Sequence, residues 1–168
     1  KKRYLVENQK LFRVSKLEEH SIAKDIEDLI LEEINKQASK ADGIIISDFV
    51  YGVITENILK KIAQIALENN LMIFGDVQCS SQVGLITRFK NYTLLCPNER
   101  EARIALHEKD LDLESLSNKI MQDTYSKRLI MKLGPQGFIA YDHDKNKSFS
   151  QAFPALSSNP IDVAGAGD

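Results

Sequence analysis

The fold of this chain is decided by residues 42–74, which read DGIIISDFVYGVITENILKKIAQIALENNLMIF. The run Ile44–Ile46 is short, continuous and apolar, as in a strand that is buried on both faces of a parallel sheet. Thr55 is a good N-cap for a helix whose apolar face would hold Ile58, Ile62, Ile65 and Ala66. Residues 71–74 are apolar again and favour a second strand. The stretch therefore predicts a strand–helix–strand unit.

The same alternation continues on both sides of this unit. Isoleucine and leucine at positions 22, 26, 29, 30 and 34 have helical spacing. We expect further strands at residues 93–96 and 129–131 and helices at residues 98–106 and 113–121. Such alternation predicts an α/β fold with a mainly parallel sheet flanked by helices. Residues 138–141 and 148–153 predict a C-terminal antiparallel hairpin, and residues 4–6 and 11–14 look extended.

Composition narrows the class of protein. The 168 residues are 43% hydrophobic and 27% charged, with a formal net charge of −2, as in an ordinary globular domain. A net charge this close to zero gives no excess of basic residues of the kind that binds nucleic acid. No apolar run is long enough to span a membrane. Cys79 and Cys96 form neither a disulfide framework nor a zinc site, which favours a cytoplasmic protein. His20, His107 and His143 show no metal-binding spacing.

The last residues, Gly165-Ala166-Gly167-Asp168, have the chemistry of an anion-binding helix start. Small residues let backbone N–H groups approach a phosphate closely. An acidic side chain is electrostatically unfavourable among amides that bind an anion unless it has a function there. A suitable function is to accept the proton of a hydroxyl that attacks the bound phosphate. A glycine-rich turn or a flexible chain end is the alternative, because short glycine motifs are weak signals on their own.

Other motifs accompany the glycine-rich one along the chain. The order of motifs along the chain resembles that of the ribokinase (PfkB-type) carbohydrate kinase family. Asp162 to Asp168 is similar to its D-x-x-G-A-G-D signature, Asn98 to Glu101 to its N-x-x-E element, and Lys132 to Gly137 to its strand-to-turn G-x-x-G. Residues 47–52 and 8–14 resemble one branch, the heptose 7-phosphate kinase domain of bifunctional ADP-heptose synthase proteins.

The resemblance implies a ribokinase-like, Rossmann-like fold and an ATP- and Mg²⁺-dependent sugar kinase. It implies that Asp168 is the catalytic base and that the amides of Gly165, Ala166 and Gly167 form the anion hole. Asn98 and Glu101 would hold Mg²⁺ through water. The same N-x-x-E spacing also fits a helix capping box, and both roles are compatible.

Further residues receive roles from the same resemblance. Lys132, Gly134 and Gly137 would border ATP, although a plain turn into the hairpin also explains the two glycines. Asp48 and Arg13 would contact the acceptor sugar; for Asp48 the alternative is a solvent-facing turn residue. The branch usually has D-P-K where this chain has Asp76-Val77-Gln78, so a cation for a substrate phosphate is missing there.

Three hypotheses for function follow. The first is a kinase for a sugar phosphate such as heptose 7-phosphate. The second is a kinase for an unphosphorylated sugar or a nucleoside, and the third is a non-catalytic nucleotide or sugar sensor. We expect residues 1–168 to be the C-terminal part of one kinase domain, with residues 1–20 as lid strands. We expect this part to be inactive alone, and the complete protein to form a homodimer without nucleic-acid or membrane partners.

Overall fold

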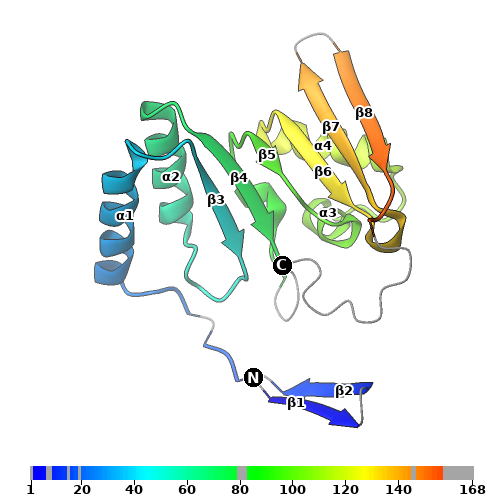
Figure 1. Ribbon diagram of the computed structural model, residues 1–168, viewed down its shortest axis with the longest axis horizontal. Helices are drawn as coiled ribbons and strands as arrows, with labels where there is room; N and C mark the ends of the chain where they lie inside the picture. The colour runs from blue at the N-terminus through cyan, green and yellow to red at the C-terminus, as the bar shows by residue number, and fades with distance from the viewer. Residues whose placement is uncertain are drawn as a thin grey trace.

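The computed structural model describes residues 2–6, 9–14, 16–18, 20–78, 83–144 and 147–156. Its main element is a six-stranded sheet, so far as these residues show, with strand order β3-β4-β5-β6-β7-β8 (Figure 1). The parallel part contains β3 (Gly43–Asp48), β4 (Met72–Val77), β5 (Leu94–Leu95) and β6 (Arg128–Lys132). β7 (Phe138–Asp144) and β8 (Lys147–Phe153) add an antiparallel hairpin beside β6. The predicted mainly parallel α/β fold with a terminal hairpin is confirmed.

Helices lie before and between the parallel strands along the chain. They are α1 (Lys24–Ala38), α2 (Glu56–Glu68), α3 (Glu99–Leu106) and α4 (Leu113–Thr124), with short 3-10 turns η1 (Ile86–Arg88) and η2 (Gly134–Gln136). Figure 1 shows α1 and α2 beside β3 and β4, and α3 and α4 beside β5 and β6. The predicted cap of α2 is confirmed, because the Thr55 side chain accepts a hydrogen bond of 3.1 Å from the backbone N–H of Ile58. No helix in the described ranges is long and apolar enough to cross a membrane.

The core lies between the sheet and the helices. Its buried aliphatic residues come from every layer, among them Ile58 of α2, Val77 of β4 and Leu129 of β6. Phe89 and Tyr92, between β4 and β5, pack edge to face with ring centroids 5.1 Å apart. Burial of this kind stabilises by about 25 cal/mol for each Å² of apolar surface removed from water. The core therefore holds the parallel strands in place. It thereby also sets the position of the sheet edge at which these strands end.

One prediction about β3 was wrong. The run Ile44–Ile46 was expected to be buried on both faces, but Ile46 is only 4% exposed whereas Ile45 is 80% exposed. The strands follow one another across the sheet in a single direction, and right-handed crossovers then place α2, α3 and α4 on the same face. Ile45 points to the opposite face, which no described residue covers at this position.

The N-terminal segment forms a separate antiparallel hairpin of β1 (Lys2–Val6) and β2 (Gln9–Val14), as its extended pattern predicted. Figure 1 shows this hairpin away from the six-stranded sheet. The rings of Tyr4 and Phe12 stack on one another with centroids 4.5 Å apart. Both side chains are about half exposed, so the ring contact adds to the backbone pairing of the two strands without burying either ring.

Candidate active site

Polar residues converge where the parallel strands end. Asp48 is the last residue of β3, Asp76 is near the end of β4, and Lys132 is the last residue of β6. Asn98 follows β5 and pairs with Lys132 as an isolated parallel bridge. Ligands of open α/β sheets bind at this carboxyl edge. The structure therefore brings Asp48, Asn98, Glu101, Lys132 and Gly134 to one edge of the sheet.

Asn98 and Glu101 form a complete capping box at the start of α3. The Asn98 side-chain oxygen accepts from the Glu101 N–H, and a Glu101 carboxylate oxygen accepts from the Asn98 N–H, each at 2.8 Å. Glu101 is only 4% exposed. The capping alternative is thereby confirmed, and it fixes the Glu101 carboxylate beside the carboxyl edge. A role in holding Mg²⁺ stays a prediction.

Lys132 and Asp76 form an ion pair across the sheet. The Lys132 Nζ donates to Asp76 Oδ1 at 2.7 Å, and both side chains keep contact with solvent. Cys96, which follows β5, lies in the same surroundings: burial raises the pKa of its thiol, and the Asp76 charge raises it further. The thiol therefore stays neutral and unreactive near pH 7. An ion pair that water reaches on both partners contributes little to stability.

Asp48 is held by a network that the sequence did not reveal. Its Oδ2 accepts from Arg88 Nη1 at 3.0 Å and its Oδ1 from the backbone N–H of Val50 at 2.8 Å. Arg88 also donates to Glu56 at 2.6 Å and to the Ile54 carbonyl at 2.9 Å. The alternative of a solvent-facing Asp48 was wrong, because the residue is 2% exposed. In the sequence, the only sign of this network is Arg88 itself, a basic residue within a mostly apolar turn.

The loop after β3 is held in an unusual conformation. Val50 has φ +61°, which β-branched residues rarely adopt because of steric strain. Gly52 has φ +85°, and a Cβ there would lie 2.1 Å from the backbone oxygen of His20. Ile22 donates its N–H to the Gly52 carbonyl at 3.0 Å. These contacts, with the bond from Val50 to Asp48, fix the loop against the segment before α1.

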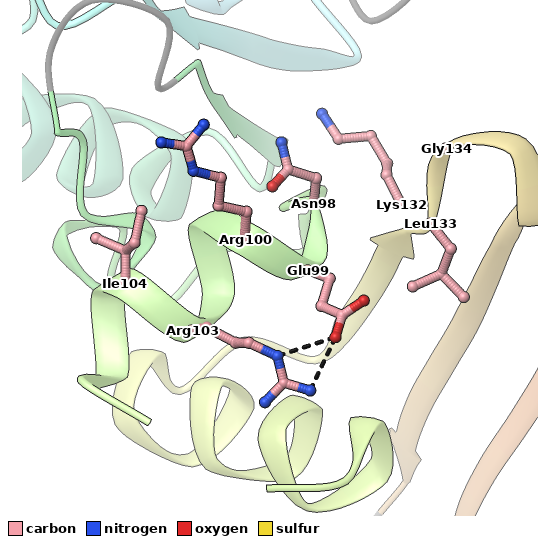
Figure 2. A pocket seen from close by; sticks show the side chains of 8 residues that line it. All are labelled: Asn98, Glu99, Arg100, Arg103, Ile104, Lys132, Leu133 and Gly134. Atoms are coloured by element: carbon pink, nitrogen blue, oxygen red, sulfur yellow. Dashed lines mark hydrogen bonds and ion pairs between the residues drawn. The ribbon is translucent and has the colours of Figure 1, made fainter. Parts of the chain in front are cut away.

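A pocket of about 590 Å³ lies beside this edge, between α3 and the end of β6 (Figure 2). It is lined by Asn98, Glu99, Arg100, Arg103, Ile104, Lys132, Leu133 and Gly134. Gly134 has φ +59°, and a Cβ there would meet nothing within 4 Å. At Gly137, φ is +90° and a Cβ would lie 2.0 Å from the Phe153 carbonyl. Gly137 is thus required where the turn meets β8, as the turn alternative proposed.

Several predicted site residues lie outside what the structure describes. Asp168 and the proposed anion hole of Gly165, Ala166 and Gly167 fall there. Arg13 belongs to β2, in the hairpin that Figure 1 shows away from the carboxyl edge. In the described part of the chain, no three His, Cys, Asp or Glu side chains gather in a way that would hold a metal ion.

Comparison with known proteins agrees with this geometry. The family model described as pfkB family carbohydrate kinase matches residues 6–168. Curated relatives named Bifunctional protein HldE include one from Sulfurimonas denitrificans, 26% identical, and one from Helicobacter acinonychis, 30% identical, each over 171 aligned residues. Both matches cover 100% of this chain but only 34% and 35% of the relatives, so the chain spans about a third of their length.

Solved structures show the same fold. Ribokinase from Giardia lamblia matches with a TM-score of 0.64 and 18% identity over 83% of this chain and 43% of that chain. Phosphofructokinase-2 from Escherichia coli, in complex with fructose-6-phosphate, matches with a TM-score of 0.58 and 15% identity over 83% and 46%. At such identities the likeness establishes a ribokinase-like fold.

Proposed function

The chain belongs to the pfkB family of carbohydrate kinases, and we propose that the complete protein transfers the γ-phosphoryl group of ATP to a hydroxyl of a sugar phosphate such as heptose 7-phosphate. The observation that carries the proposal is the gathering of Asp48, Asn98, Glu101 and Lys132 at the carboxyl edge of the parallel strands. Relatives named Bifunctional protein HldE align with the whole chain, which supports this branch of the family.

In the proposed reaction the chain supplies a base and an anion hole. Asp168 takes the proton of the attacking sugar hydroxyl, whose oxygen forms a bond to the γ-phosphorus as the bond to ADP breaks. The backbone amides of Gly165, Ala166 and Gly167 stabilise the charge on the transferred group. These roles come from the family signature at residues 162–168.

Asn98 and Glu101 fit a water-mediated Mg²⁺ site. Magnesium prefers oxygen ligands and keeps several of its waters, so it needs few protein side chains. One Glu101 oxygen is engaged by the Asn98 N–H, and this bond fixes the carboxylate without neutralising it. When bound with ATP, Mg²⁺ neutralises charge on the phosphates. Asn98 and Glu101 are the residues that would hold it.

A phosphorylated acceptor is supported by the position of Lys132. The branch's usual lysine after the second strand is replaced by Gln78, which favours an unphosphorylated sugar or a nucleoside as acceptor. Lys132, however, extends from the end of β6 to Asp76, two residues before Gln78 in the chain, and pairs with its carboxylate at 2.7 Å. An ammonium group is therefore present at this edge, paired with Asp76 in the absence of ligand, and we keep the sugar phosphate as the first candidate.

A substrate panel tests the proposal. The full-length protein would be assayed for Mg²⁺-dependent ADP formation with sugar 7-phosphates, other sugar phosphates, free sugars and nucleosides. We expect turnover with sugar phosphates. Turnover with free sugars or nucleosides alone would replace the acceptor class, and ATP binding without turnover on any acceptor would favour a sensor over a kinase.

A further inference from the structure

Arg88, in the 3-10 turn η1, joins three segments at the carboxyl end of β3. Its guanidinium donates to Asp48 at 3.0 Å and to Glu56 at 2.6 Å. It also donates to the Ile54 carbonyl at 2.9 Å. Asp48 is the last residue of β3, Glu56 is the first residue of α2, and Ile54 lies in the loop between them. One side chain therefore holds both ends of this loop.

The loop itself, residues 49–55, is strained, and Asp48 links it to Arg88. The Asp48 carboxylate accepts from the Val50 N–H at 2.8 Å, and Val50 has a φ of +61°. The Asp48 carbonyl accepts from the Gln78 N–H, just after β4, also at 2.8 Å. Backbone strain persists only where the surrounding structure holds it, and it is found most often at functional sites. Arg88 therefore acts on the strained part of the loop through Asp48.

The loop lies at the far end of the carboxyl edge from the proposed ATP site. That site, at Lys132 and Gly134, is beside the end of β6. Neighbouring strands are about 4.8 Å apart, so the three spacings from β3 to β6 amount to about 14 Å. A sugar that accepts the γ-phosphoryl group therefore has room nearer to β3. There the loop presents Phe49 and Val53, whose side chains are nearly half exposed.

From these contacts we propose that Arg88 is a positioning residue for the acceptor: through Asp48 it holds residues 49–55 in the conformation to which the sugar binds. The Asp48 carboxylate is buried and engaged on both oxygens, so it connects Arg88 to the loop. A loop that is already fixed loses less conformational entropy on binding, and this preorganisation raises affinity. The proposal rests on the proposed kinase function and adds to it the residue that shapes the acceptor side of the site.

The test measures ligand binding by the full-length protein. Isothermal titration would compare wild type, Arg88→Ala and Arg88→Lys, with ATP and with heptose 7-phosphate, fructose 6-phosphate, ribose and adenosine as acceptors. We expect Arg88→Ala to weaken the acceptor that wild type binds best by about tenfold, which is the cost of fixing the backbone of about one further residue on binding. ATP affinity should not change. Arg88→Lys keeps a charge for Asp48 but cannot replace the planar guanidinium, so it should recover part of the loss.

Ile120→Ala is the matched control for stability. Ile120 is fully buried in α4, so its truncation also destabilises the protein. Figure 1 shows α4 beside β5 and β6, away from the loop after β3. We expect only the Arg88 variants to weaken the acceptor and to accelerate hydrogen exchange within residues 49–55. All variants are compared at a temperature at which circular dichroism shows that wild type and Ile120→Ala are folded.

Equal acceptor affinity in wild type and Arg88→Ala overturns the proposal. An equal loss in Ile120→Ala, an equal loss of ATP affinity, or a wild type that binds none of the acceptors also overturns it. Where Arg88→Ala is unfolded, Arg88→Lys decides, and an acceptor affinity equal to that of wild type then overturns the proposal. ADP formation by the same samples tests the kinase function separately. A protein that binds a sugar through this loop without phosphorylating any acceptor refutes the kinase function and supports the positioning role of Arg88.

Discussion

Replacing Arg88 with alanine is expected to destabilise the protein substantially, because Arg88 is the charged partner of a buried carboxylate. Asp48 is 2% exposed and relies on Arg88 Nη1 and the Val50 N–H for its hydrogen bonds. Arg88 also ties the loop after β3 to the turn before β5 through the Ile54 carbonyl. Its loss leaves a charge with one donor in the protein interior.

The size of the effect follows from burial. Removing one partner of a fully buried ion pair costs about 3–5 kcal/mol. The Arg88 side chain is 23% exposed, so water reaches part of the vacated site and the expected loss of unfolding free energy is about 2–4 kcal/mol. Arg88→Ala should lower mainly the stability of the protein, although the loop that the substitution loosens borders the proposed sugar site.

Urea unfolding followed by far-ultraviolet circular dichroism measures this loss. Glu56→Gln is the control, because Glu56 is 65% exposed and removing its bond to Arg88 should cost less than about 1 kcal/mol. The double variant Asp48→Asn/Arg88→Ala should be less destabilised than the sum of its single variants, since both act on one pair. A loss below about 0.5 kcal/mol for Arg88→Ala, or strict additivity, would refute the reasoning.

Three further outcomes are expected. Glu101→Gln keeps an oxygen that can accept a hydrogen bond in the capping box but loses the charge for Mg²⁺. Activity should therefore fall about 10–100-fold while the melting temperature stays near that of wild type. A fall in activity that is accompanied by a large fall in melting temperature would contradict the metal role. Gly137→Ala places a Cβ 2.0 Å from the backbone oxygen of Phe153 at the end of β8, whereas the Cβ of Gly134→Ala meets nothing within 4 Å. Urea unfolding should therefore show a much larger loss of stability for Gly137→Ala, and equal losses would contradict this packing. The hydrogen bond from Thr55 lowers the pKa of Glu27, so the Glu27 carboxylate stabilises the fold at neutral pH, and this contribution disappears as pH falls through the lowered pKa. The difference in unfolding free energy between wild type and Glu27→Gln should therefore shrink on acidification. A difference that stays constant or grows would contradict the assignment.

Local signals made much of the fold predictable. The caps at Thr55 and Asn98 are side-chain contacts to a backbone N–H three residues later, so sequence spacing alone reveals them. The strands were recognised from short apolar runs between helices, and their parallel order follows from the connections. The family resemblance, rather than local spacing, singled out Asn98, Glu101, Lys132 and Asp48, and the structure brings all four to the carboxyl edge of the sheet.

Contacts between distant residues were not predictable in this way. Asp48 and Arg88 are 40 positions apart, and Lys132 and Asp76 are 56 apart, so no spacing rule links them. The exposure of Ile45 depends on which face the helices cover, which an apolar run does not specify.

The central claim, that this family signature belongs to a working kinase, is tested most directly at Asp168. The measurement is phosphoryl transfer from ATP to the best acceptor of the substrate panel by the full-length protein and its Asp168→Asn variant, with ATP affinity measured in parallel. The account predicts a rate lower by about 10²–10⁴-fold with ATP affinity little changed, which is the usual weight of a general base. An Asp168→Asn variant that transfers phosphate as fast as wild type would contradict it.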